Sequence, residues 1–222
     1  MQSMIYCPPP RARSVALNPT ARLIRDAATL GVPLEEDGAA RLLLLLEELA
    51  HWNQRFNLTA ITAPEAMLTH HLLDSLSIHP DLHGQRIADV GTGAGFPGLP
   101  LAVVNPQRHF TLIDSSEKKV RFVANTARRM GLTNVEALHA RSEQMKPATP
   151  FDTVVTRAFA PLPRLVQWVA PLCGPDTRVL AMKGRLPAEE IAALPPPWRL
   201  ERSREIAVPG LEAARCVLVL RR

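Results

Sequence analysis

A glycine-rich turn after a short apolar run constrains the fold of this chain more than any other feature. Residues 87–98 read Ile-Ala-Asp-Val-Gly-Thr-Gly-Ala-Gly-Phe-Pro-Gly, and the apolar run before the turn predicts a short strand at residues 86–90. Glycines at alternate positions carry no Cβ, so the backbone can approach a ligand closely. A helix is expected at residues 97–104, with the positive end of its dipole directed at the turn. This order is typical of a nucleotide-type site at the carboxyl end of the first strand of an α/β sheet.

The chain beyond residue 85 alternates between strand and helix patterns. After the first strand, apolar runs predict strands at residues 109–113, 135–139, 151–156 and 177–182. Helices are expected between them, at residues 117–130 and 162–172. Apolar strands separated by helices favour a parallel sheet buried on both faces. Two further strands, at residues 198–208 and 216–220, are only about seven residues apart and predict an antiparallel hairpin.

The first third of the chain has a different texture. Residues 19–82 show helical periodicity in three stretches, at residues 23–30, 42–52 and 64–76, with Thr62 close enough to help cap the third. Residues 1–18 contain three consecutive prolines and predict a flexible arm. We therefore expect an arm (1–18), a helical N-terminal part (19–84) and an α/β domain (85–222) with a mainly parallel seven-stranded sheet.

Composition narrows the class of protein. The chain of 222 residues is 46% apolar and 21% charged, which are globular values. No apolar run approaches the roughly 18 residues that cross a bilayer. Three widely spaced cysteines, with no metal-type spacing, indicate a reducing compartment, so we expect a cytoplasmic protein without a membrane. A net charge of +5 permits a nucleic-acid partner without requiring one.

Asp89 favours one cofactor over another at the glycine turn. The residues from Asp89 form Asp-x-Gly-x-Gly-x-Gly, and the dinucleotide fingerprint counted from Gly91 fails at Phe96. A carboxylate there would repel a pyrophosphate but suits a cationic cofactor. S-adenosyl-L-methionine carries an ammonium and a sulfonium and no phosphate, so the pattern fits it better than NAD.

Polar residues also follow the next two predicted strands. Asp114 ends the second strand, 23 residues beyond Gly91, where an acidic side chain can accept hydrogen bonds from ribose hydroxyls. Ser142 and Glu143 follow the third strand, where the adenine edge should lie. Glu143 taken alone would be read as a solvated residue at a helix start.

The fourth strand ends at Arg157 and lacks the motifs of two kinds of methyl transfer. There is no Asn/Asp-Pro-Pro-Tyr/Phe for an exocyclic amine and no Pro-Cys nucleophile for pyrimidine C5. Guanine N7 has a free lone pair and no proton to lose, so its alkylation requires positioning more than a base. Arg157 is accordingly the candidate catalytic residue, with a structural ion pair as the alternative.

Two other residue groups carry weaker hypotheses. His70 and Asp74 are four residues apart, which does not fit a two-histidine metal site but allows a hydrogen-bonded pair on one helix face. No metal is expected. The arginines near the C-terminus are candidates for phosphate contacts, as are two in the predicted helix 117–130: Arg128, Arg129, Arg199, Arg202, Arg204, Arg215, Arg221 and Arg222.

Taken together, these residues resemble the RsmG (GidB) family of bacterial 16S ribosomal RNA guanine-N7 methyltransferases. The likeness runs densely over residues 42–184 and is most specific in the Phe-Pro-Gly end of the turn and in His-x-x-Asp-Ser-Leu. In family order, the matching segments are Trp52-Asn53, Asn57-Leu58-Thr59, His70-His71, Asp74-Ser75-Leu76, Gly93 to Pro100, Asp114-Ser115, Lys118-Lys119, Phe122, Arg157 and Lys183-Gly184.

The resemblance implies a Rossmann-like class I methyltransferase domain with an N-terminal helical extension and S-adenosyl-L-methionine as methyl donor. The implied acceptor is N7 of one guanine in the decoding region (530 loop) of 16S rRNA, free or within the small subunit, and we expect a monomer. The cofactor-binding residues that the resemblance implies by position are Gly91, Phe96, Asp114, Ser115, Ser116, Ser142, Glu143 and Arg157. The pattern of the glycine turn itself adds Asp89, Gly93 and Gly95.

Two other classes of function stay open at the level of sequence. An NAD-linked oxidoreductase would use the overlapping Gly93-x-Gly95-x-x-Gly98 pattern, although no proton-relay residue is evident. A non-catalytic RNA-binding or ribosome-assembly protein could retain a cofactor fold without methyl transfer. The methyltransferase hypothesis is preferred over both.

Overall fold

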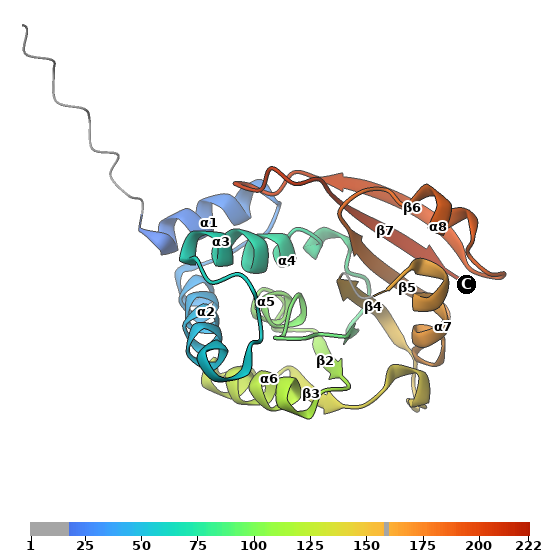
Figure 1. The fold of residues 1–222 in the computed structure, drawn as a ribbon, viewed down its shortest axis with the longest axis horizontal. Helices are drawn as coiled ribbons and strands as arrows, with labels where there is room; N and C mark the ends of the chain where they lie inside the picture. The colour runs from blue at the N-terminus through green and yellow to red at the C-terminus, as the bar shows by residue number, and fades with distance from the viewer. Residues whose placement is uncertain (1–17, 158–159) are drawn as a thin grey trace, which may run out of the picture.

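A seven-stranded sheet forms the centre of the molecule (Figure 1). The computed structural model describes residues 18–157 and 160–222, and the predicted arm falls almost wholly outside them. The sheet order is β3-β2-β1-β4-β5-β7-β6. The strands are β1 (Arg86–Val90), β2 (His109–Asp114), β3 (Val135–His139), β4 (Phe151–Arg157), β5 (Cys173–Lys183), β6 (Arg199–Ile206) and β7 (Arg215–Arg221).

The prediction of a mainly parallel sheet with a C-terminal hairpin is confirmed. Strands β1 to β5 pair in parallel, whereas β7 runs antiparallel to both β5 and β6. Strand order changes direction between β1 and β4, because β2 and β3 extend the sheet one way and β5 the other. Such a switch point opens a crevice outside the carboxyl ends of the strands, which is where ligands bind in open α/β sheets.

Each of the six predicted helical stretches corresponds to helix in the structure, although the ends differ, and α8 was not predicted. They are α1 (Pro19–Thr29), α2 (Glu36–Phe56), α3 (Pro64–Met67), α4 (Asp74–Leu76), α5 (Gly98–Val103), α6 (Glu117–Arg129), α7 (Leu162–Val169) and α8 (Ala188–Ala192). Helix α2 begins six residues before the predicted stretch at 42–52, because its first turn is acidic and polar and shows no apolar periodicity. Short 3₁₀ turns lie at His79–Asp81, Ser142–Gln144 and Ala170–Leu172.

The stretch predicted as one helix at residues 64–76 has a wider π-helical turn at Leu68–Leu73 between α3 and α4. Ala63 is the N-cap and no side chain caps the helix, so the predicted capping by Thr62 is wrong. π-Helical turns are rare and occur frequently at functional sites. This turn carries His70 and His71.

Two hydrophobic cores lie on opposite faces of the sheet, and alternate residues of each strand divide between them. In β1, for example, Ile87 belongs to one core and Ala88 to the other. The first core contains the N-terminal helices together with α5 and α6, and the second contains α7. The N-terminal helices thus share the first core with one face of the sheet: α2 packs on α5 and α6, and α1 packs on α2 and the π-helical turn. That residues 19–84 form a separate helical part and residues 85–222 an α/β domain stays a prediction.

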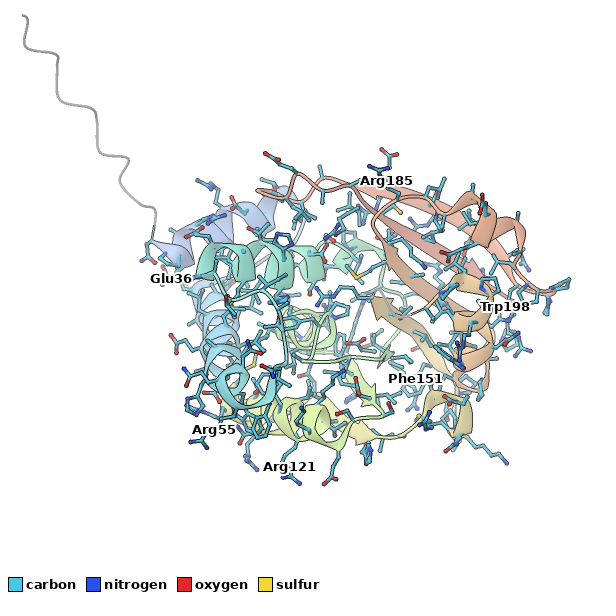
Figure 2. The ribbon with its side chains drawn as sticks, in the orientation of Figure 1. Glu36, Arg55, Arg121, Phe151, Arg185 and Trp198 are labelled. Carbon is cyan, nitrogen blue, oxygen red and sulfur yellow. The ribbon has the colours of Figure 1, made fainter. Side chains whose placement is uncertain are left out.

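The outer surface is rich in arginine. Arg55, Arg121 and Arg185 are exposed, the first two along the lower edge of the molecule in Figure 2 and Arg185 along the upper edge. Across the described part of the chain, no helix is both long enough and apolar enough to span a membrane.

Candidate active site

The glycine turn has a backbone that only glycine adopts easily. Gly91, Gly93 and Gly95 have φ values of 71°, 61° and 85°, in the left-handed region. A Cβ on Gly95 would lie 2.4 Å from the Leu99 side chain, so this glycine allows α5 to pack closely behind the turn. Space around Gly93 is open, since a Cβ added there would have only a backbone oxygen nearby, at 4.0 Å.

Asp89 lies beneath the turn and braces it. Its Oδ2 accepts hydrogen bonds from Thr92 Oγ1 at 2.7 Å and from the Gly98 amide at 2.8 Å. Burial raises the pKa of Asp89 to about 6, although both hydrogen bonds oppose this shift. Its Oδ1 is buried and has no hydrogen-bond partner among the described residues. One oxygen of the carboxylate therefore holds the turn, while the other has unused acceptor capacity.

The first cavity, of about 260 Å³, opens beyond the carboxyl ends of β1, β2 and β3. The Asp114 carboxylate lies in its wall and accepts hydrogen bonds from two amides, those of Gly93 and Ser116, each at 2.9 Å. Lys119 Nζ is 3.8 Å from Asp114 Oδ2. The lining residues are Val90, Gly91, Ile113, Asp114, Ser115, Lys119, Ala140, Arg141, Ser142, Glu143 and Trp168.

Five of the predicted cofactor residues lie together in this lining, namely Gly91, Asp114, Ser115, Ser142 and Glu143. Gly93 and Ser116 contact Asp114 through their amides without lining the cavity, and Asp89 and Gly95 support the turn from behind. Sequence reasoning assigned no role to Trp168, which projects from α7, and the Arg164 guanidinium lies 4.5 Å from the centre of its ring. In the sequence, the four-residue spacing of Arg164 and Trp168 was the signal that could have predicted this contact, because residues four apart share one helix face.

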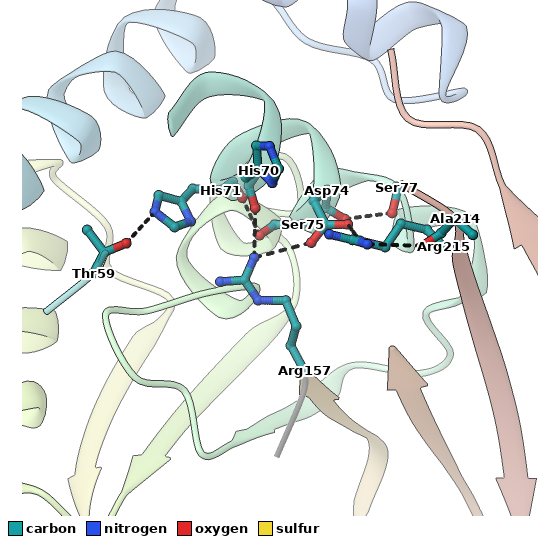
Figure 3. Close-up of polar contacts among 9 residues, drawn as sticks. All are labelled: Thr59, His70, His71, Asp74, Ser75, Ser77, Arg157, Ala214 and Arg215. Carbon is teal, nitrogen blue, oxygen red and sulfur yellow. Dashed lines mark hydrogen bonds and ion pairs between the residues drawn. The ribbon is translucent and has the colours of Figure 1, made fainter. Parts of the chain in front are cut away.

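A second cavity, of about 410 Å³, lies further along the same edge, beyond β4 and β5 and the start of β7. Its lining residues are Ile61, His70, His71, Asp74, Arg157, Met182, Lys183, Gly184 and Arg215. Arg157 Nη1 donates to the His70 carbonyl at 3.0 Å and to Asp74 Oδ2 at 3.3 Å (Figure 3). The helix region of residues 64–76 and the strand ends thus form this cavity jointly.

Phe96 lies between His71 and Arg157 rather than in the first cavity. The His71 ring stacks on Phe96 with centroids 4.7 Å apart, and the Arg157 guanidinium lies 5.4 Å from the Phe96 centroid. Burial, followed by the positive charge of Arg157, lowers the pKa of His71 to about 4. His71 is therefore a neutral imidazole near neutral pH, with Nε2 at 3.0 Å from Thr59 Oγ1.

The structure changes two of the weaker hypotheses. The predicted His70–Asp74 side-chain pair is wrong, because the Asp74 oxygens contact Arg157 and Arg215. Most arginines proposed for phosphate contacts already have acidic partners, since Arg202 and Arg204 both pair with Asp81, and Arg129 with Glu48. Within residues 18–157 and 160–222, no three His, Cys, Asp or Glu side chains are grouped as metal ligands would be.

The strands follow the order 3-2-1-4-5-7-6, and the seventh is antiparallel. Together with a carboxylate-lined cavity beyond β1 and β2, this topology defines a Rossmann-like class I methyltransferase. A family model described as GidB, rRNA small subunit methyltransferase G, matches residues 39–219. The chain belongs to this family. It is therefore an S-adenosyl-L-methionine-dependent methyltransferase, and neither the oxidoreductase nor the non-catalytic hypothesis is supported.

Curated relatives of the same family align with nearly the whole chain. The Ribosomal RNA small subunit methyltransferase G of Pseudomonas aeruginosa (strain LESB58) is 46% identical over 201 residues, covering 90% of this chain and 94% of the relative. The protein of that name from Escherichia fergusonii is 40% identical, covering 92% of this chain and 98% of the relative. TrmN from Thermus thermophilus superposes with a TM-score of 0.54 at 22% identity, covering 70% of this chain and 53% of TrmN, which supports the fold alone.

Proposed function

We propose that this chain transfers the methyl group of S-adenosyl-L-methionine to N7 of one guanine in the 530 loop of 16S rRNA. The observation that carries the proposal is the family match over residues 39–219, and curated relatives named for rRNA small subunit methylation agree with it. The N7 atom and the decoding-region loop come from the sequence resemblance. We further propose that the protein acts as a monomer in the cytoplasm, on rRNA free or within the small subunit.

The residues around the first cavity fit the cofactor. Asp114 accepts two amide hydrogen bonds and has lone pairs left for the two ribose hydroxyls. Ser142 and Glu143 lie where the adenine edge would be, and the Gly91 backbone passes along the wall. The unpartnered Asp89 Oδ1 suits the ammonium group at the methionine end. When bound, the cofactor supplies an electrophilic methyl carbon on a sulfonium.

The second cavity is the natural place for the acceptor base, because it adjoins the first along the same sheet edge. In the displacement, the N7 lone pair forms the new bond to carbon and the carbon–sulfur electron pair returns to sulfur. The positive charge moves from the sulfonium to the guanine ring, and no proton is transferred. This chemistry agrees with the low pKa of His71, which makes its imidazole a weak base. Arg157 would hold the base in line with the methyl group.

The proposal is tested by supplying methyl-labelled S-adenosyl-L-methionine with three separate acceptors: small subunits from cells lacking this modification, naked 16S rRNA, and ribosomal protein. Label recovered as 7-methylguanosine after digestion is the expected result, followed by mapping of the nucleotide. Comparing subunits with naked RNA tells which is the substrate. Label in protein, or in another RNA atom, would contradict the proposed acceptor.

A matched pair of variants controls this experiment. Asp114→Ala removes the proposed ribose contact at the carboxyl edge of the sheet. Asp152→Ala removes a carboxylate that accepts the Gln85 and Arg86 amides at the opposite edge. Transfer should fall in the first variant and persist in the second at a temperature where both are folded.

A further inference from the structure

Asp74 occupies an unusual position for a carboxylate in the second cavity. Its side chain is only 5% exposed and contacts two arginines from different strands. Oδ2 lies 3.3 Å from Arg157 Nη1 at the end of β4, and Oδ1 lies 2.9 Å from Arg215 Nε at the start of β7 (Figure 3). Because burying a charge is costly unless it is paired, this arrangement requires both arginines to stay close.

A second aspartate has the same chemistry in a different place. Asp81 is 2% exposed and pairs with Arg202 and Arg204, both from β6. Asp74 and Asp81 therefore each tie the segment of residues 64–82 to the C-terminal strands of the sheet. Only Asp74 lines the second cavity, whereas Asp81 lies outside its lining. Asp81 is consequently the natural control for any role of Asp74 beyond docking.

The contacts of Arg157 show what Asp74 adds. Nη1 is occupied by Asp74 and by the His70 carbonyl, and the guanidinium packs over the Phe96 ring. Since a guanidinium is planar, fixing one terminal nitrogen and the position over a ring sets the direction of the remaining donors. Those donors belong to Nη2 and Nε, which these two hydrogen bonds leave unused.

Arg215 completes the arrangement from the other side. Its Nε donates to Asp74 Oδ1, and its Nη1 donates to the Ala214 carbonyl at 3.0 Å. With Arg157 on Oδ2, both oxygens of the Asp74 carboxylate are therefore held. One carboxylate between two guanidinium groups leaves one net positive charge at the cavity, because Lys183, the other cation of the lining, is paired with Glu190. This net charge suits a polyanionic substrate.

We propose that Asp74 is a positioning residue of the methyl-transfer site, which holds Arg157 in the orientation that aligns the acceptor base. This inference rests on the proposed function, because it assigns the second cavity to the acceptor. Arg157 is pre-ordered before the RNA arrives, so its rotamer entropy is not lost during the reaction.

The first test compares Asp74→Asn with Asp81→Asn, which remove the same charge from the same segment. Both variants should lower the melting temperature by similar amounts. At saturating cofactor and RNA, Asp74→Asn should lower kcat at least tenfold, as expected for a misaligned reacting group, and Asp81→Asn less than twofold. Calorimetry should show that S-adenosyl-L-methionine affinity changes less than twofold in either variant. Equal kcat losses would reduce Asp74 to a docking residue and overturn the proposal.

The second test needs no substrate. The ¹⁵N-labelled protein without cofactor should show an ordered Arg157 Nε–H signal, identified by its absence in Arg157→Lys. Its heteronuclear NOE should fall in Asp74→Asn and stay unchanged in Asp81→Asn. A rigid Arg157 signal in Asp74→Asn would contradict positioning. If Asp74→Asn does not fold, Arg215→Gln releases Asp74 Oδ1 instead, and wild-type kcat and NOE in that variant would overturn the proposal.

The two proposals can fail separately. If the wild-type protein transfers no label to RNA, the proposed function fails, and the NMR comparison still decides whether Asp74 orders Arg157. If the wild-type protein methylates RNA and the two aspartate variants behave alike, only the positioning role fails.

Discussion

The two cavities lie along one edge of the sheet, yet the chain builds them differently. The first follows the ends of three parallel strands, and its central contact, from the Gly93 amide to Asp114, spans 21 residues. The second joins the helices before the sheet to strands β4, β5 and β7, and its contacts from Asp74 to Arg157 and Arg215 span 83 and 141 residues. The central contact of the first cavity therefore lies within a local βαβ unit, whereas the second cavity depends on how distant parts of the chain dock.

This difference predicts that cofactor binding and acceptor alignment are separable. The polar lining of the first cavity consists of Asp114 and of side chains that follow β2 and β3, whereas that of the second includes the ion-paired Arg157, Asp74 and Arg215 from distant segments. Changes in the second cavity should act on turnover with little effect on cofactor affinity, and changes at Asp114 should act on cofactor affinity. Each of the following predictions tests one side of that division.

The largest effect is expected for Arg157→Ala. Loss of the guanidinium removes the group proposed to align the base, and kcat should fall about a hundredfold, the typical cost of misplacing a reacting group. The measurement is single-turnover methyl transfer at saturating cofactor and RNA, with cofactor affinity determined by calorimetry. An unchanged rate would leave Arg157 as an ion-pair partner of Asp74 only.

The control for this variant is Arg22→Ala. Arg22 is as exposed as Arg157, at 21% against 22%, and it also contacts a buried aspartate, Asp26. It lies on α1, outside the lining of both cavities. A similar loss of turnover in Arg22→Ala would show that unpairing a buried carboxylate is sufficient to reduce activity.

The next effect is on cofactor affinity in Asp114→Ala. A hydrogen bond to a charged group contributes roughly 1–3 kcal/mol, so the dissociation constant for S-adenosyl-L-methionine should rise about 5- to 150-fold. Part of this loss will reflect the Gly93 and Ser116 amides, which lose their acceptor. Calorimetry on the folded variant, beside Asp152→Ala, measures it. Unchanged affinity would remove Asp114 from the cofactor site.

Much of the fold could be predicted because its signals are local. Strands β1 and β3 were predicted with their observed bounds, and the other strands within a few residues, because apolar runs bounded by turns are short-range patterns. Helix α8 was missed, since its five residues have no buried side chain and thus no apolar periodicity. The π-helical turn at Leu68–Leu73 was also missed, because widening by one residue leaves almost no trace in sequence periodicity.

The residues of the site likewise divide into those that local sequence patterns predict and those that they do not. Gly91, Asp114, Ser142 and Glu143 could be placed together because each follows a parallel strand, and parallel strands end at one edge. The partners of Asp74 could not be predicted, since 83 and 141 residues separate them and nothing local marks an arginine as its partner. The position of Phe96 between His71 and Arg157 likewise depends on docking of the N-terminal helices.

The smallest predicted effect is on the pH dependence of stability, to which His71 of the second cavity and Asp89 beneath the glycine turn contribute with opposite signs. Burial lowers the pKa of His71 from 6.5 to about 4, so below pH 6.5 the unfolded chain binds a proton that the folded chain resists. The contribution of His71 to the free energy of unfolding is therefore fully present above pH 6.5 and is lost as pH falls toward 4. At pH 5 about 2 kcal/mol of it has been lost. Asp89 acts oppositely, because its pKa is raised from 3.8 to about 6 and stability falls as pH rises through that window.

The pH dependence of the stability of the whole protein contains both contributions. The measurement is therefore the difference in unfolding free energy between the wild type and a variant. Urea unfolding of the wild type and of His71→Gln at pH 5 and pH 8 cancels Asp89, which both proteins retain. The stability gap between wild type and variant should be about 2 kcal/mol larger at pH 8 than at pH 5. His51→Gln, which makes the same replacement at an exposed position of α2, is measured beside it as the control for the substitution itself. A gap independent of pH would mean that the imidazole in the second cavity is not kept neutral by burial.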